Sequence, residues 1–375
     1  MPGLNDTVRY WDYLGAYTPR RAEYLAAVDR VFSSGRLVLG REVAEFEKGV
    51  AAYCGAAFAV GVNSGTDAIL LALKALGIGA GDEVITVSNT AVPTVAAIRA
   101  SGATPVFVDV EEDTYLMDVS RVEAAVTPRT RCLLPVHLCG QMADMAPLQE
   151  IARRRGGRVI EDCAQAMGAA YGGGRAGSFG DVGAFSFYPT KILGAFGDAG
   201  AMTTSDPDLA ARLRRLRFYG IAEGYHAEEE GFNSRLDEVQ AAILNLKLPG
   251  IEAAASARRD IARIYDEGLA GVGDIARPAV RPGRRHQYYL YTVRTQHRDR
   301  LMEFLDKEGI ETKINYPHPV HLMRGYSGLG YREGDLPVTE RLARSILSLP
   351  IYPELPTRHA ERVVETVRRF FRGGR

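Results

Sequence analysis

The sequence predicts an α/β fold in which a mainly parallel sheet is covered by helices on both faces. Short apolar runs alternate with helical patterns through the first half of the chain, which is typical of strand-helix-strand units. Runs such as 84–87 and 106–108 lack polar alternation, so both faces of the sheet are expected to be buried. In such a sheet, ligands bind beyond the carboxyl ends of the strands.

Seven strands form the predicted sheet, most of them separated by helical patterns. Each is a short apolar run of the length that strands usually have. The expected strands are 58–62, 83–87, 105–109, 132–137, 158–161, 183–186 and 199–203.

The last third of the chain has a different pattern. Helical segments at 234–246 and 252–269 are longer than those before them, and a strand-like run follows at 288–293. We therefore expect a large domain at 1–249, which includes an N-terminal segment, and a smaller C-terminal α/β domain at 250–375.

Composition excludes several classes of protein. The chain has 375 residues, 46% of them hydrophobic, and its 46 basic residues equal its 46 acidic ones, so no overall field favours nucleic acid or an anionic membrane. Residues 1–6 lack a signal-peptide pattern, and no apolar run approaches the ~18 residues of a membrane span. Neither the four cysteines nor the seven histidines have metal-ligand spacing. We expect a cytoplasmic protein with no disulfide and no metal.

A lysine and a carboxylate are the first candidate site residues. Lys191 follows the run 183–186 in a glycine-rich segment, and Asp162 ends the run that begins at Arg158. Pyridoxal phosphate (PLP) chemistry requires a lysine amine that attacks the cofactor aldehyde and a carboxylate that keeps the pyridine nitrogen protonated. The alternative is a surface lysine and an aspartate that caps a turn, which is the commoner role of each residue type.

A phosphate site is the third candidate element. Ser64, Gly65 and Thr66 stand between the strand 58–62 and an apolar helical run. Backbone N–H groups at a helix N-terminus bind phosphate, and a glycine permits close approach. An ordinary helix N-cap would have the same residues.

Four motifs in chain order resemble the DegT-type (DegT/DnrJ) sugar-nucleotide aminotransferases. They are Ser64-Gly65-Thr66-Asp67-Ala68, Glu161-Asp162-Cys163-Ala164-Gln165, Ser186-Phe187-Tyr188-Pro189-Thr190-Lys191 and the run 231–242, which begins Gly-Phe-Asn-Ser-Arg. The resemblance extends from 34–40 to 347–353. It implies the aspartate-aminotransferase fold, called fold type I, PLP cycling with pyridoxamine phosphate (PMP), and sites at a homodimer interface.

The resemblance also implies roles for the cofactor residues. Lys191 links covalently to the cofactor and carries the proton, and Asp162 pairs with the pyridinium nitrogen. Gln165 meets the ring hydroxyl, Ser186 joins the 64–66 turn on the phosphate, and Asn233 reaches the phosphate from the partner subunit. Asn233 could also simply begin the helix that follows it.

Substrate residues follow from the same resemblance, with two departures from the family pattern. Ala91 stands where many relatives stack an aromatic residue on the cofactor ring, and Asn315 replaces a histidine. Arg258 and Arg259 are further possible diphosphate contacts, unless they lie on solvated helix faces. The expected substrate-binding residues are Tyr188, Arg235, Tyr316 and His321.

The predicted activity is transfer of an amino group from L-glutamate to a keto group, at C-3 or C-4, of a nucleotide-linked deoxysugar in amino-sugar and antibiotic biosynthesis, and the expected nucleotide is dTDP. A keto-inositol acceptor is an alternative. A sugar dehydratase of this fold typically has histidine in place of the lysine. A PLP-sensing regulator would require a nucleic-acid-binding module, for which the sequence offers neither charge nor room.

Overall fold

A seven-stranded sheet forms the centre of the molecule. A computed structural model describes residues 7–373, so residues 1–6, where no signal peptide was expected, lie outside the described residues. The strand order is β1-β9-β8-β5-β4-β2-β3. The strands are β1 (Phe58–Val62), β2 (Glu83–Val87), β3 (Thr104–Val108), β4 (Thr130–Leu133), β5 (Arg158–Asp162), β8 (Val182–Ser186) and β9 (Gly200–Thr204).

The sheet is parallel except for one strand. β9 runs antiparallel to both of its neighbours, with Gly200 opposite Val62 of β1 and opposite Ser186 of β8. Because β9 is reversed, its first residue lies at the edge where the neighbouring strands end. The predicted seven-stranded, mainly parallel sheet is confirmed.

Helices cover the sheet. The helices of this part are α3 (Arg41–Cys54), α4 (Gly65–Ala75), α5 (Val92–Ser101), α6 (Val122–Ala125), α7 (Met145–Arg155) and α8 (Pro207–Leu216). Of these, α4, α5 and α8 begin within a few residues of the strands that precede them. Strands β1, β2, β5, β8 and β9 carry mostly buried residues, as expected of a sheet covered on both faces.

Three predicted elements differ from the structure by more than one residue at an end. One is the strand-like run expected at 288–293, where β11 covers Tyr291–Arg294. The strand expected at 132–137 is β4, which begins at Thr130 and ends at Leu133. Residues 134–137 still contact the neighbouring strands, because Leu134 N–H donates to the Ile85 carbonyl and an isolated parallel bridge joins Val136 to Asp162. The helix expected at 234–246 is α9 (Glu238–Lys247). Residues 234–237 precede the helix, and Asp237 is extended and forms a bridge with Val38.

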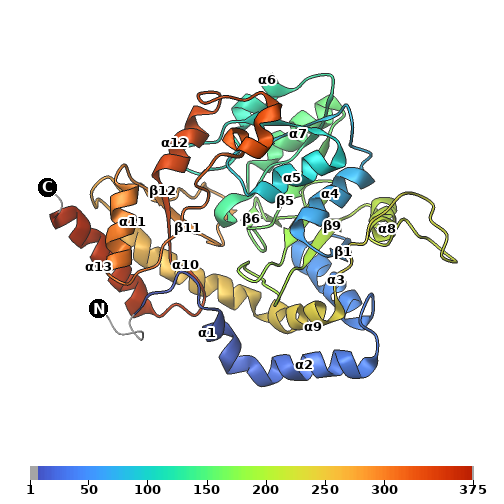
Figure 1. Cartoon of the computed structure of the whole chain (residues 1–375), viewed down its shortest axis with the longest axis horizontal. Helices are drawn as coiled ribbons and strands as arrows, with labels where there is room; N and C mark the ends of the chain where they lie inside the picture. The colour runs from blue at the N-terminus through green and yellow to red at the C-terminus, as the bar shows by residue number, and fades with distance from the viewer. Residues whose placement is uncertain (1–6, 374–375) are drawn as a thin grey trace.

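The C-terminal part forms a second apolar cluster. Buried residues between Ile261 and Val367 pack together with Val8 from the start of the chain. The elements of this part lie at the left of Figure 1, away from α4, α8 and β1 at the right. They are α10 (Ile251–Gly268), β11 (Tyr291–Arg294), α11 (Arg298–Lys307), α12 (Pro337–Ser345), β12 (Ile346–Leu349) and α13 (Thr357–Gly373). A division near residue 249 stays a prediction, and the turn Leu248–Gly250 between α9 and α10 is compatible with it.

Smaller elements lie at the edges. The helices α1 (Tyr13–Tyr17) and α2 (Arg21–Ser34) run along the bottom of Figure 1, where α2 packs on α9. A small sheet joins β6 (Ala170–Tyr171), β7 (Gly174–Arg175) and β10 (Arg284–Arg285). Among the described residues, no helix has the length and apolar content needed to cross a bilayer.

Candidate active site

A cavity of about 320 Å³ lies at the carboxyl edge of the sheet. Its walls come from the ends of β1, β5 and β8 and from the loops after β2 and β8. Nearly all of the predicted cofactor residues line it, together with two predicted substrate residues: Ser64, Gly65, Thr66, Asp162, Gln165, Ser186, Tyr188, Lys191 and Tyr316. The volume is within the range of small-molecule sites.

One end of the cavity is the N-terminus of α4. Ser64 is the N-cap, and its hydroxyl oxygen accepts a hydrogen bond from Asp67 N–H at 3.1 Å. A Cβ atom at Gly65 would lie 2.6 Å from Ser186 Cβ, and one at Gly200 would lie 2.4 Å from the Ser64 backbone. Only glycines permit this close packing, which leaves free N–H groups of the helix and the Ser186 hydroxyl facing one space. The arrangement fits a phosphate group.

The deep wall of the cavity is Asp162 at the end of β5. Its side chain is 4% exposed. Oδ2 accepts a hydrogen bond from the Thr94 hydroxyl at 2.8 Å, and Oδ1 accepts one from Ala164 N–H at 3.1 Å. The Thr90 hydroxyl lies 2.8 Å from that of Thr94. Each carboxylate oxygen therefore has one fixed donor and keeps capacity for a cationic partner in the cavity.

Gln165 and Tyr316 close the side of the cavity next to Asp162. Gln165 Oε1 accepts a hydrogen bond from Cys139 N–H at 2.8 Å, and its Nε2 donates to the Tyr316 hydroxyl oxygen at 2.9 Å. Burial raises the pKa of Tyr316 well above its ordinary value, so the phenol keeps its proton. The Tyr316 O–H is thus available as a donor toward the cavity.

Lys191 lines the same cavity as Asp162. Its Nζ is 4.5 Å from the centre of the Tyr289 ring, and the Tyr289 hydroxyl is 3.2 Å from that of Thr190. Among the described residues, no carboxylate forms an ion pair with Lys191, so the amine faces an aromatic ring rather than an acid. A lysine that acts as a nucleophile requires such freedom.

Several lining residues were not predicted from the sequence. They are Ile69, Thr90, Pro93, Thr94, Val136, Ala164, Thr190, Asp198 and Tyr289. Thr94 is one turn inside α5, and its distance to Asp162 depends on how α5 packs, which no local sequence pattern gives. Ala91, the N-cap of α5, does line the cavity, without an aromatic ring.

Asn233 and Arg235 do not line the chain's own cavity. Asn233 is exposed, and the Arg235 guanidinium packs over the rings of Phe218 and Tyr219 at 5.5 and 5.7 Å. The neighbouring Ser234 connects this segment to the cavity, because its hydroxyl donates to Asp67 Oδ2 at 2.6 Å. Neither residue therefore contributes to the cavity of its own chain.

The prediction that His321 contacts substrate is not supported, because this side chain is fully buried away from the cavity. His321 Nδ1 lies 2.7 Å from the Ser88 hydroxyl, and Nε2 lies 3.3 Å from Glu340. Ser88 also accepts a hydrogen bond from His321 N–H at 3.0 Å. His321 thus fastens the loop of Tyr316 to the end of β2.

Arg258 and Arg259 are also absent from the cofactor cavity. Arg258 is 1% exposed, and its guanidinium donates to main-chain carbonyls. Arg259 donates to Gln287 Oε1 at 3.0 Å. Both arginines of α10 thus donate hydrogen bonds within the protein, and neither lines the cofactor cavity.

A buried polar cluster lies beneath the same edge of the sheet. His137, Glu161 and Cys163 bring possible metal ligands within 4.8 Å of one another. Their lone pairs are already engaged: His137 Nδ1 accepts from Ala143 N–H at 3.1 Å, so Nε2 carries the hydrogen and donates to Glu161 at 3.0 Å. Glu161 also accepts from three backbone N–H groups, those of residues 177, 179 and 180. The cluster is a hydrogen-bonded support for the fold.

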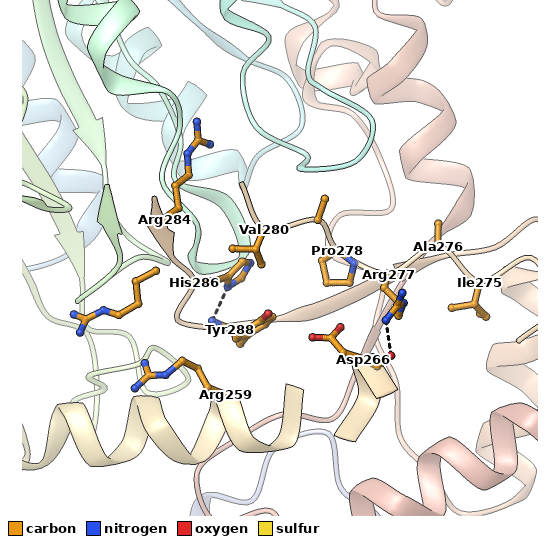
Figure 2. A pocket seen from close by; sticks show the side chains of 12 residues that line it. Arg259, Asp266, Ile275, Ala276, Arg277, Pro278, Val280, Arg284, His286 and Tyr288 are labelled. Carbon is orange, nitrogen blue, oxygen red and sulfur yellow. Dashed lines mark hydrogen bonds between the residues drawn. The ribbon is translucent and has the colours of Figure 1, made fainter. Parts of the chain in front are cut away.

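A larger cavity, of about 820 Å³, lies along the segment that leads to β11 (Figure 2). Its lining includes no lysine. Figure 2 shows Arg259, Arg277 and Arg284 pointing in different directions, so their charges do not converge on one ligand position. Size alone therefore does not make this cavity the active site.

The reversed β9, the lysine loop beside it and the carboxylate at the end of β5 define a transferase of the aspartate-aminotransferase fold, fold type I. Similar proteins agree. A transaminase from Micromonospora megalomicea subsp. nigra, named for dTDP-3-amino-3,4,6-trideoxy-α-D-glucose, is 52% identical over 98% of this chain and 100% of its own. A transaminase of the same name from Streptomyces venezuelae is 50% identical over 96% of this chain and 95% of its own.

Solved structures give the same result. The crystal structure of Streptomyces venezuelae DesV in complex with a ketimine intermediate has a TM-score of 0.95 and 50% identity, and covers 97% of this chain and 98% of that one. The profile of the DegT/DnrJ/EryC1/StrS aminotransferase family matches residues 19–368. This chain belongs to that family, whose members are PLP-dependent, and it is an aminotransferase.

Proposed function

We propose that this chain is a PLP-dependent aminotransferase that moves the amino group of L-glutamate to the C-3 keto group of a dTDP-linked deoxysugar. The observation that carries the proposal is the identity of 50–52% to two transaminases with this product, over nearly the whole chain. The sequence left C-3 and C-4 open, and these names favour C-3. An intact lysine-carboxylate cavity supports catalysis rather than regulation.

The cavity residues fit PLP. The N–H groups at the start of α4, with Thr66 and Ser186, would hold its phosphate, and Asp162 would hold the protonated pyridine nitrogen. Gln165, fixed by Cys139 N–H, would orient the ring through its hydroxyl. When bound, the cofactor supplies an electron sink for the carbon that carries the amine. Thr90, Ala91 and Pro93 form the wall where relatives place an aromatic ring.

The chain's own groups provide positioning and proton transfer. Lys191 Nζ, close to the Tyr289 ring and free of ion pairs among the described residues, accepts and returns the proton at the reacting carbon. The Thr94 hydroxyl and Ala164 N–H hold the Asp162 carboxylate in one orientation. A positioned base of this kind contributes about 10² to 10⁴ in rate. The protonated Tyr316 is placed to donate to an oxygen near the ring.

A homodimer is part of the proposal, since Asn233 and Arg235 lie outside their own cavity. Exposed apolar side chains surround the nearby segments, notably Phe32 and Leu37, which are 60% and 51% exposed. A second copy that covers them could receive Asn233 at its phosphate site. The proposed compartment is the cytoplasm, because all four cysteines are buried and free, as in a reducing environment.

A two-step absorbance measurement tests the activity. L-glutamate should shift the visible band of the lysine-linked cofactor in the purified protein, and dTDP-3-keto-4,6-dideoxyglucose should restore it. A Lys191→Ala variant should show neither change. Restoration by a 4-keto isomer or a keto-inositol alone would overturn the C-3 assignment, and no response to glutamate would overturn glutamate-driven transamination.

A mixed dimer tests the shared site. Lys191→Ala and Asn233→Ala variants should each be nearly inactive alone, whereas co-expression should restore about a quarter of the activity per protomer, because a dimer of one copy of each has one site with both residues intact. If Asn233 acts within its own subunit, mixing the variants restores nothing.

A further inference from the structure

A second, smaller cavity lies on the other side of Lys191. It has a volume of about 170 Å³ and is bounded by the N-terminal segment, the lysine loop, α9, α10 and the segment after β12. Its lining includes Trp11, Tyr24, Lys191, Lys247, Arg258 and Glu354. Lys191 is thus a common wall of this cavity and of the cofactor cavity.

Arg258 brings a buried charge to this cavity. The side chain is 1% exposed, and Nη1 donates to the carbonyl oxygens of Ile351 at 2.7 Å and Tyr288 at 3.3 Å. Nε has no hydrogen-bond partner. Among the residues of the described range, no carboxylate lies within ion-pair distance of it. A buried guanidinium without an acidic partner is unfavourable unless an anion completes it.

Lys247 is a second cation without an acidic partner. Nζ donates to the Gly194 carbonyl at 2.6 Å and lies 4.6 Å from the centre of the Phe196 ring. Burial lowers the pKa of Lys247 to about 8, so the amine is still mostly protonated at pH 7. The remaining donors of its ammonium group are available to a ligand.

The other charged residues do not balance these cations. Arg20 is already paired with Glu23 at 2.7 Å and donates to the Leu246 carbonyl. Glu354 is the one carboxylate among the lining residues; it is exposed, and its charge acts on Lys247 and Arg258 without forming an ion pair with either. The cavity therefore has an excess of positive charge, with room for a small anion and little more.

We infer that this cavity binds the distal carboxylate of the amino donor, through Lys247 and Arg258. The inference rests on the proposed function, in which glutamate reacts beside Lys191 Nζ. Two methylene groups separate the distal carboxylate of glutamate from the reacting carbon, and Lys191 lines both cavities. In the inferred arrangement the reacting carbon lies beside Lys191 in the cofactor cavity and the distal carboxylate lies in the smaller one, whereas alanine has no group to place there.

Glutarate binding tests the site without any reaction, because glutarate has both carboxylates and no amine. Titration calorimetry on the cofactor-loaded protein should give a Kd that rises about tenfold or more in Lys247→Met, and Lys247→Arg should keep most of the affinity. Lys74→Met is the matched control, since Lys74 is also half-buried and donates to a carbonyl, that of Ser101 at 3.0 Å, away from both cavities. Equal glutarate affinity in Lys247→Met and Lys74→Met would overturn the inference.

The half-reaction separates this inference from the proposed function. Lys247→Met should lower the efficiency with glutamate about tenfold and leave that with alanine unchanged, so the ratio of the two donors changes. An equal loss with both donors would contradict donor recognition and indicate a structural effect. If the unaltered protein reacts with glutamate and Lys247→Met keeps the donor ratio, the function stands and the inference fails. If the unaltered protein ignores glutamate, the proposed function fails itself.

Discussion

Glu161 and Asp162 are neighbours at the end of β5, and they have opposite tasks. Alternation along the strand turns Asp162 toward the cofactor cavity and Glu161 toward the other side of the sheet. Both carboxylates are buried. Glu161 accepts hydrogen bonds from His137 and from three backbone N–H groups, whereas Asp162 accepts two and faces open space.

The comparison shows that saturation, rather than burial, separates a structural carboxylate from a functional one. Glu161 fastens the turn at 177–180 to β5 and thereby holds the segment that leads into β8. Asp162 accepts two hydrogen bonds, which fix the orientation of its carboxylate and leave it able to bind a ligand in the cavity. Substitutions at four residues test this distinction.

Asp162→Asn should have the largest effect. An amide cannot balance the charge of a protonated pyridine nitrogen, so the second-order rate constant of the glutamate half-reaction should fall roughly a thousandfold, about 4 kcal/mol. The unfolding free energy should change by no more than about 1 kcal/mol, because the amide oxygen can still accept from Thr94. Unfolding of the variant under the usual assay conditions would contradict the contrast with Glu161.

Glu161→Gln should act on stability instead. The new NH₂ group would face N–H donors in a site with no water, at a cost of roughly 2–4 kcal/mol in unfolding free energy. Urea denaturation followed by circular dichroism measures it. The folded fraction should retain its rate within about threefold, whereas a rate loss like that of Asp162→Asn would merge the two roles.

Thr94→Val removes the hydroxyl that holds Asp162 while it keeps the shape of the side chain. A hydrogen bond to a charged group contributes about 1.5–3 kcal/mol, so kcat should fall about tenfold or somewhat more. Thr94→Ser should restore most of it. If valine changed the Tm but not kcat, Thr94 would be a packing residue of α5 only.

A buried neutral ring extends the comparison to pH. His286 is 4% exposed, its Nδ1 accepts from Tyr288 N–H at 2.8 Å (Figure 2), and burial lowers its pKa to about 3. The unfolded chain then binds more protons below about pH 6.5, so the stability that neutral His286 contributes is lost as the pH falls from 6.5 toward 3.

Between pH 8 and pH 6 the expected loss is about 1 kcal/mol. Denaturant midpoints at both pH values should show it, and His286→Gln should reduce the difference by about that amount. An unchanged difference would assign the pH effect to other groups.

The sequence predicted the part of the site that local chain geometry builds. Ser64, Gly65 and Thr66 belong to a strand-turn-helix, and Asp162 and Lys191 directly follow strands, so parallel pairing brings them to one edge. The central sheet was predicted because its strands are short apolar runs. The bounds of the central strands differ mainly at β4, which ends at Leu133 rather than at residue 137.

The rest depends on packing between distant segments. Thr94 and Tyr289 reach the cavity through the placement of α5 and of the segment before β11. His321 matched a substrate motif, yet it is buried beside Ser88 and Glu340. The motif could not predict these contacts, because both partners lie far from His321 along the chain. Periodicity and motif spacing contain no information on such contacts.

Because β9 is reversed, the residues of the site are positioned by strand pairs of very different sequence separation. Because Ser186 pairs with Gly200, residues 187–199 close a hairpin loop, and Lys191 reaches its neighbours by local chain closure. Asp162 arrives through the crossover between the parallel strands β5 and β8, and the turn at 64–66 arrives through the pairing of β1 with the distant strand β9, and such long-range pairing is slower. During refolding, the backbone amides of residues 187–199 should therefore be protected from hydrogen exchange before those around Asp162. The cavity should become able to bind the cofactor only when the distant strands have paired.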